Sequence, residues 1–297
     1  MRTPIAPAVL LMLVACNSYA EGPPPRAVTS PQPSVTITGG EVVAPTAAIP
    51  TRPDRLRDDL VHTTRALKEA IERWRAGESE RSVVSLLALR QQRIYQVLAA
   101  RPGVARKVLG TLPRGLARFA RETVTASGRL RALIEPLKDL PDWKTYRPVP
   151  AGLLRHFYEK AQRRFGVRWQ ILAAINFVES RFGRILGPSS AGALGPMQFI
   201  PATWDAYGNG GDVMDPHDAI LGAARYLRAS GAPDRMRAAL HSYNNSYEYV
   251  HAIRTYARQM TRDPRNFYAY YFWQVFVLTT DGQVQLTGPG GVRPATP

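Results

Sequence analysis

The sequence contains almost no cysteine: Cys16 is the only one among its 297 residues. With no second cysteine, the mature fold cannot hold an intramolecular disulfide. The chain also lacks the Cys/His spacing of a zinc finger, a Walker loop and any RNA-binding signature. These absences argue against nucleic acid as a partner, and we expect none.

Acidic residues are also few. The chain has 23 aspartates and glutamates and 39 lysines and arginines, which gives a formal net charge of +16. A basic excess of this size favours acidic partners such as nucleic acid, anionic lipid or an anionic wall polymer. Charge alone does not choose among these partners, so the choice depends on the rest of the sequence.

Long apolar runs are missing as well. The candidate run, residues 5–15 behind Arg2, is broken by Pro7 and is too short for a stable membrane span, but it suits the core of a signal peptide. It ends Leu13-Val14-Ala15-Cys16, which resembles a bacterial lipobox whose cysteine is lipidated. Ordinary cleavage after Ala20 is the alternative. Both interpretations predict an exported protein, and the first anchors it to a membrane through Cys16.

What remains divides into four stretches after the predicted signal peptide and lipobox of residues 1–20. Residues 21–53 are rich in proline and predict a semi-extended tether. Residues 54–145 show apolar positions at helical spacing and predict a small helical domain, whose role is structural support or binding through its basic faces. Residues 146–280 predict a second helical unit, and residues 281–297 a disordered tail. The expected fold class is mainly α.

The second unit carries clear helix signals. Pro150 opens a helix that ends near Gly166, and a second helix covers residues 169–182. Asp215, followed by Pro216, predicts the start of a helix that ends at Gly231. We further expect Asp234 and Ser246 to cap the two helices that follow. Residues 267–278 predict a helix that turns into a strand and packs back on this unit.

Glu179 is the most informative residue. It shares an apolar helical stripe with Leu172, Ile175 and Phe182, and Gly183 follows as the expected C-cap. Desolvation and the negative end of the helix dipole would both raise the carboxyl pKa. A carboxylic acid that stays protonated near neutral pH suits cleavage of a glycosidic bond. The alternative is a solvated glutamate in a surface ion pair.

Two further segments are candidate parts of a site. Residues 189–201 are poor in charge and rich in Gly and Ala, which predicts either a compact connection or a groove floor where a sugar approaches backbone and Gln198. Tyr243-Asn244-Asn245-Ser246 stands at a helix junction, where Asn and Ser also serve as ordinary caps.

Taken together, Glu-Ser, then Ser-x-Ala-Gly-Ala-x-Gly-x-Met-Gln, then Tyr-Asn resemble the soluble lytic murein transglycosylase family, which is related to goose-type lysozyme. The resemblance covers roughly residues 148–262 and implies a lysozyme-like transglycosylase domain. Pro196 departs from the family, whose soluble members usually carry an aliphatic residue there. The resemblance assigns the catalytic acid/base to Glu179 and substrate contacts to Ser189 (or Ser190, because the loop is one residue longer), Gln198, Phe199, Tyr243 and Asn244.

The resemblance also implies a mechanism with one carboxylate. Most glycosidases use two, whereas in this family the substrate supplies the missing nucleophile. The implied reaction cleaves the β-1,4 bond between N-acetylmuramic acid and N-acetylglucosamine in peptidoglycan and forms 1,6-anhydromuramyl ends. Three alternatives stay open: a hydrolytic muramidase of the same fold, a wall-binding lipoprotein without activity, and a nucleic-acid binder.

A metal site receives little support from the sequence. The segment 209–215 is acidic and glycine-rich, yet it lacks the alternating ligands and the distal glutamate of a calcium loop. We therefore expect no metal and no cofactor.

Overall fold

The structure is a computed structural model that describes residues 35–36, 42–43, 47–140, 143–289 and 291. The expected signal peptide and the lipidation site at Cys16 lie outside the described residues. Within the expected tether, strand β1 (Val35–Thr36) pairs antiparallel with β2 (Val42–Val43). None of the described helices is both long and apolar enough to cross a membrane.

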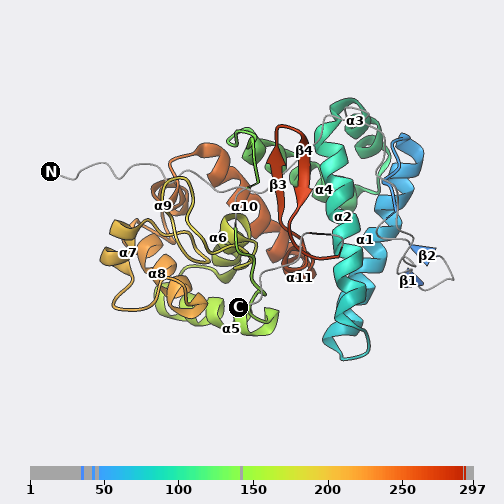
Figure 1. Cartoon of the computed structure of the whole chain (residues 1–297). Coiled ribbons are helices and arrows are strands. Elements are labelled where there is room, and N and C mark those ends of the chain that lie inside the picture. Colours follow the sequence, from blue (N-terminus) through green and yellow to red (C-terminus); the bar gives the residue numbers. More distant parts are fainter. Residues whose placement is uncertain (1–34, 37–41, 44–46, 141–142, 290, 292–297) are drawn as a thin grey trace.

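The described residues form eleven helices and four short strands, so the prediction of a mainly helical chain is confirmed. Figure 1 shows α1, α2 and α3 at one end of the molecule, α5, α7, α8 and α9 at the other, and α10, α11 and the β3–β4 hairpin between them. The helices are α1 (Pro53–Arg75), α2 (Arg81–Ala100), α3 (Pro102–Thr111), α4 (Arg114–Arg131), α5 (Ala151–Phe165), α6 (Trp169–Ser180), α7 (Pro201–Tyr207), α8 (Pro216–Ala229), α9 (Met236–Tyr243), α10 (Tyr247–Arg262) and α11 (Arg265–Tyr271).

Helix α6 lies in the middle of the second helical unit and differs from the expected one-sided helix. Every residue from Trp169 to Ser180 is buried except Gln170. A helix that is apolar nearly all round belongs inside a fold, covered on several sides. Helices α5 and α10 pack against α6, and Glu179 near its C-terminal end is therefore buried.

The four N-terminal helices share one hydrophobic core with the rest of the chain. Helix α4 packs on α10, and α1 packs on α11. Buried hydrogen bonds cross the same boundary: the Gln92 side chain donates to the Gln274 carbonyl at 2.9 Å and accepts from the Gln274 amide at 2.7 Å. The hydroxyl oxygens of Ser127 and Tyr256 lie 3.2 Å apart. The division near residue 145 stays a prediction, but the two parts are packed into one body.

Local helix signals were partly right. Asp215 caps α8 by accepting from the Asp218 amide, and Ser246 caps α10 by accepting from the Tyr249 amide. The expected cap at Asp234 is wrong, because α9 begins after Arg235 and no side chain caps it. Helix α8 ends at Ala229, before Gly231. Helix α6 ends at Ser180, and its C-cap is Arg181 with a φ of 52° rather than Gly183.

The C-terminal part contains more structure than expected. Strand β3 (Phe276–Thr279) follows α11, as the helix-to-strand prediction required, and pairs antiparallel with β4 (Gly282–Gln285). Leu286 and Thr287 beyond β4 are buried. The prediction of a disordered tail from residue 281 is therefore wrong for residues 282–289. Residues 282–285 pair with β3, and Leu286 beyond them is buried in the core.

Candidate active site

Glu179 is the second-last residue of α6, and its side chain is 5% exposed. Burial raises its pKa to about 8, while a hydrogen bond from Tyr249 pulls the pKa down. The Tyr249 hydroxyl donates to Oε1 of Glu179 at 2.7 Å. No lysine or arginine of the described chain forms an ion pair with it, so the surface-pair interpretation does not hold. A buried carboxyl without a cation keeps its proton to unusually high pH.

Tyr249 was not singled out from the sequence as a site residue. It lies in the first turn of α10, where the Ser246 cap sets the start of the helix. Its hydroxyl is buried, and desolvation followed by the nearby Glu179 raises the tyrosine pKa well above its ordinary value. Tyr249 therefore remains a hydrogen-bond donor to Glu179 at any moderate pH.

Two further residues of α6 hold the Gly/Ala-rich loop against the glutamate helix. The Asn176 side-chain amide donates to the Pro196 carbonyl at 2.6 Å, and the Ser180 hydroxyl donates to the same carbonyl at 2.7 Å. Tyr158 in α5 fixes the Asn176 side chain by donating to Oδ1 at 2.5 Å. These contacts position the loop by its backbone, so Pro196, which departs from the family pattern, still supplies the carbonyl they need.

The loop itself is a tight turn. Leu194 and Phe199 exchange two backbone hydrogen bonds of 2.9 Å. Gly195 has a φ of 75°, and a Cβ there would lie 2.0 Å from the Val213 carbonyl oxygen. Gln198 has a φ of 51°, and its side-chain Nε2 donates to the Gly195 carbonyl at 2.9 Å. Its Oε1 is buried and has no hydrogen-bond partner among the described residues. An unpaired buried acceptor is costly, which suits a group that meets a ligand.

Tyr243 joins the loop to the end of α9. Its hydroxyl donates to the Met197 carbonyl at 2.7 Å, and its ring lies 6.1 Å from the Phe199 ring. After burial, the charge of Glu179 is the next cause that raises the Tyr243 pKa, so the two groups are neighbours. Phe199 is 2% exposed and packs on Trp204 as well, which makes it a packing residue of the loop.

The remaining predicted residues contribute less directly. Asn244 is buried at the C-cap of α9. The Ser189 hydroxyl is buried and accepts from the amides of Ala191 and Ala193 at 3.2 and 3.1 Å, so it closes the start of the loop. Ser190 is exposed. The structure thus gathers Glu179 with Tyr243, Tyr249 and the Gln198 loop, whereas the hydrogen bonds of the Ser189 hydroxyl stay within its own loop.

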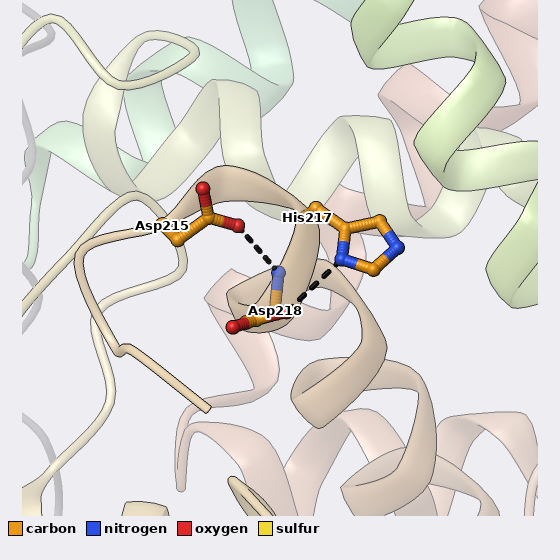
Figure 2. A group of neighbouring side chains, drawn as sticks. All are labelled: Asp215, His217 and Asp218. Carbon is orange, nitrogen blue, oxygen red and sulfur yellow. Dashed lines mark hydrogen bonds and ion pairs between the residues drawn. The ribbon is translucent and has the colours of Figure 1, made fainter. Parts of the chain in front are cut away.

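Asp215, His217 and Asp218 form the one group with metal-like spacing among the described residues, and their candidate ligand atoms lie within 4.8 Å of one another. Figure 2 shows that these atoms already serve the start of α8: Asp215 accepts from the Asp218 amide, and Asp218 accepts from His217. The Lys160 ammonium also lies 2.8 Å from Nε2 of His217, and its positive charge opposes a cation there. The group is therefore a helix cap, and we assign no ion to it.

Comparison with known proteins shows which family the segment around this site resembles. Residues 156–265 match the family described as the Transglycosylase SLT domain. The chain is 33% identical over 128 residues to "Membrane-bound lytic murein transglycosylase F" of Thiobacillus denitrificans. This match covers 40% of this chain and 27% of that protein. It is 31% identical over 122 residues to "Membrane-bound lytic murein transglycosylase F 1" of Alkalilimnicola ehrlichii, with 38% and 24% covered.

The chain spans about a quarter of the length of these relatives. No solved structure matches the chain. The matched segment runs from α5 to the start of α11 and contains every residue of the candidate site, while the N-terminal helices lie outside it. The chain thus carries an SLT transglycosylase domain that is distantly related to these proteins and is preceded by a helical region.

Proposed function

We propose that this protein cleaves the β-1,4 bond between N-acetylmuramic acid and N-acetylglucosamine in peptidoglycan and leaves 1,6-anhydromuramyl ends. The observation that carries the proposal is Glu179: a carboxyl group buried at the end of α6, with a pKa of about 8 and a single tyrosine donor. The match of the surrounding segment to the Transglycosylase SLT domain supports the same reaction.

Glu179 acts first as the acid. With a pKa of about 8 it is mostly protonated at pH 7, so it can deliver a proton to the oxygen that links the two sugars. The bond from that oxygen to the muramic acid C1 breaks, and positive charge develops at C1. The N-acetyl group of the same sugar stabilises this charge, so the site needs no second carboxylate.

Glu179 acts next as the base. It is a carboxylate after the first step, and the Tyr249 hydroxyl stabilises that charge through its hydrogen bond. The carboxylate takes the proton from the muramic acid C6 hydroxyl, whose oxygen bonds to C1 and closes the anhydro ring. The proton returns Glu179 to its starting state. General acid/base catalysis of this kind contributes about two to four decades of rate.

The other residues of the site position the substrate. The unpaired Oε1 of Gln198 accepts from a sugar hydroxyl or acetamido N–H. Asn244 and the loop that begins at Ser189 and Ser190 supply further polar groups, and Tyr243 and Phe199 hold the loop in shape through packing and the Met197 carbonyl.

The rest of the chain fits an exported wall enzyme. Cys16 carries the lipid anchor in this proposal, and residues 21–53 hold the folded part away from the membrane, on its outer face or in the periplasm. The net charge of +16 draws the enzyme to anionic wall polymers and to the acidic peptides of its substrate.

Mass spectrometry of the muropeptides released from purified sacculi tests the proposal. Wild type should release products lighter by one water than hydrolytic products, and Glu179→Gln should release none while keeping the fold. Glu159→Gln is the matched control, because Glu159 is a surface carboxylate paired with Arg155. Full-weight reducing ends would identify a muramidase, and no release from the wild type would favour a wall-binding role.

A further inference from the structure

A cavity of about 330 Å³ lies between the N-terminal helices and the SLT domain, and none of its lining residues belongs to the candidate site. Its wall is built by α1, α2 and α4 on one side and by α10 and α11 on the other, so neither part of the chain encloses it alone. A cavity of this size falls within the range of small-molecule sites. We call it the seam cavity.

The seam cavity has an apolar inner wall. Leu67 and Ile71 stand four residues apart on one face of α1, and both are buried. Ala269 of α11 is also buried, and the half-buried side chains of Leu116 and Phe119 complete the wall from α4. An apolar ligand body that covers these side chains removes their surface from water, which favours binding.

One polar group of the wall lacks a partner. Gln91 is 3% exposed, and its Nε2 donates to the Thr64 hydroxyl oxygen at 3.3 Å, but its Oε1 has no hydrogen-bond partner among the described residues. The other two amides of the wall are engaged: Nδ2 of Asn266 donates to the Gln259 carbonyl at 2.8 Å, and Oε1 of Gln259 accepts from Tyr270. A buried acceptor without a partner costs stability, and a ligand with an N–H or O–H group removes that cost.

The outer wall of the seam cavity is basic. Four cations of the wall form ion pairs with three carboxylates: Lys68, Arg118, Arg262 and Arg265 with Glu72, Glu122 and Asp263. Arg118 has the most exposed side chain of the four, at 65%, and its ion pair to Glu122 at 3.5 Å uses a carboxylate that Arg262 also contacts. These pairs leave one positive charge in excess, and a carboxylate placed beside Arg118 balances it.

We propose that the seam cavity binds a small amphipathic organic anion. Its apolar body packs on Leu67 and Ile71, an N–H or O–H group donates to Oε1 of Gln91, and its negative group pairs with Arg118. Such a ligand contacts both the helical region and the SLT domain, so it holds the two parts together and raises the unfolding midpoint by mass action. The inference does not depend on the reaction at Glu179.

Isothermal calorimetry on the full-length protein tests the proposal with three small probes. Indolepropionate carries an apolar ring, an N–H group and a carboxylate, and it should bind with a Kd of about 1 mM or less. Its N-methyl derivative lacks the donor and should bind about five- to tenfold more weakly. Tryptamine, in which an ammonium replaces the carboxylate, should bind at least about threefold more weakly.

Gln91→Leu removes the acceptor and should weaken the binding of indolepropionate by the same factor of about five to ten. It should leave the Kd of the N-methyl derivative unchanged, because the variant and the derivative remove the same hydrogen bond. Gln96→Leu is the matched control, since Gln96 is half-buried in the same helix and does not line the cavity.

Arg118→Gln changes an exposed side chain, so it tests the site even if Gln91→Leu fails to fold. It should weaken the binding of indolepropionate by about threefold and should not weaken the binding of tryptamine. Arg121→Gln, at an exposed position of the same helix outside the cavity wall, should change neither.

Four results would overturn the proposal. Indolepropionate could show no saturable binding to the wild type, or tryptamine could bind more tightly than indolepropionate. Indolepropionate could also bind equally to the wild type, Gln91→Leu and Arg118→Gln, which would mean adventitious binding elsewhere on the surface. Finally, Glu179→Gln should bind indolepropionate as the wild type does, and loss of binding in that variant would place the probe at the candidate active site instead.

Discussion

At the scale of single residues, the site depends on one ionisable group and the single donor that contacts it. Burial alone would keep Glu179 neutral, which suits an acid but not the base it must become. Tyr249 balances this by stabilising the carboxylate through one hydrogen bond while its own pKa stays far too high for it to ionise. The pair therefore sets how readily Glu179 gives up its proton and takes one back.

This balance predicts the effect of Tyr249→Phe on pH dependence. Because the lost hydrogen bond lowers the Glu179 pKa, its removal raises that pKa above about 8. The acid form is present below its pKa, so the alkaline limb of kcat/KM should move to higher pH, by about one unit for a hydrogen bond to a charged group. The measurement is kcat/KM for muropeptide release between pH 6 and pH 10.

Tyr95→Phe is the matched control for this measurement. The Tyr95 hydroxyl is also buried, but it has no hydrogen-bond partner among the described residues and Tyr95 belongs to α2. Its removal should leave the alkaline limb where it is. If Tyr249→Phe left the limb in place or moved it to lower pH, Glu179 would not be the group that titrates there.

At the scale of elements, the loop between α6 and α7 is held in shape by hydrogen bonds to its backbone and not by apolar packing alone. Its central hydrogen bonds join Leu194 and Phe199, and its outer ones join Pro196 to α6. Such a loop depends on the backbone shape of Gly195, since the Val213 carbonyl occupies the space that a side chain would need.

Gly195→Ala should therefore destabilise the protein more than Gly192→Ala. Both glycines have a φ of 75°, so alanine is strained at both positions by about 1–2 kcal/mol, but only Gly195 has backbone within contact of a new Cβ. We expect the loss of unfolding free energy at Gly195 to exceed that at Gly192 by at least about 1 kcal/mol. Urea unfolding measures the difference, and equal losses would mean that the Val213 segment moves aside freely.

The same element shows what the sequence could and could not predict. The caps at Asp215 and Ser246 depend on neighbours three residues away, and the sequence predicted both. The bond from Tyr249 to Glu179 spans 70 residues, and the clamp on Pro196 joins it to residues 16 and 20 positions earlier. Helical spacing marks Tyr249 only as a core residue, because spacing carries no information about which distant group it meets.

The fold shows the same limit. Helix type and order followed from apolar spacing and turn residues, but the C-cap of α6 at Arg181 and the uncapped start of α9 did not, because tertiary packing decides where a helix begins and ends. Strand β4 was missed because Gly282–Gln285 has little apolar pattern of its own and is a strand only through its pairing with β3. The motif residues were found together because the family resemblance joins them across the sequence.

At the scale of the whole molecule, the N-terminal helices are part of the body that carries the site. They lie outside the segment that matches the Transglycosylase SLT domain, yet α4 packs along α10, the helix that presents Tyr249. Gln259 of α10 donates to the Thr123 hydroxyl of α4 at 3.1 Å and accepts from Tyr270. The helical region thus packs against the same helix that presents Tyr249 to Glu179.

This packing predicts a single unfolding transition, which Gln92→Ala should shift as a whole. The substitution leaves the buried N–H and C=O of Gln274 without partners, at a cost of about 2–4 kcal/mol for the two groups. Because Gln92 lies in α2 and Gln274 follows α11, both halves should lose stability together. Circular dichroism and tryptophan fluorescence should give coincident curves with one lower midpoint.

Gln96→Ala, a half-buried position in the same helix, should change the midpoint little. Two separate transitions, with α1–α4 melting while the Glu179 region stays folded, would contradict the shared core and make the helical region an independent domain.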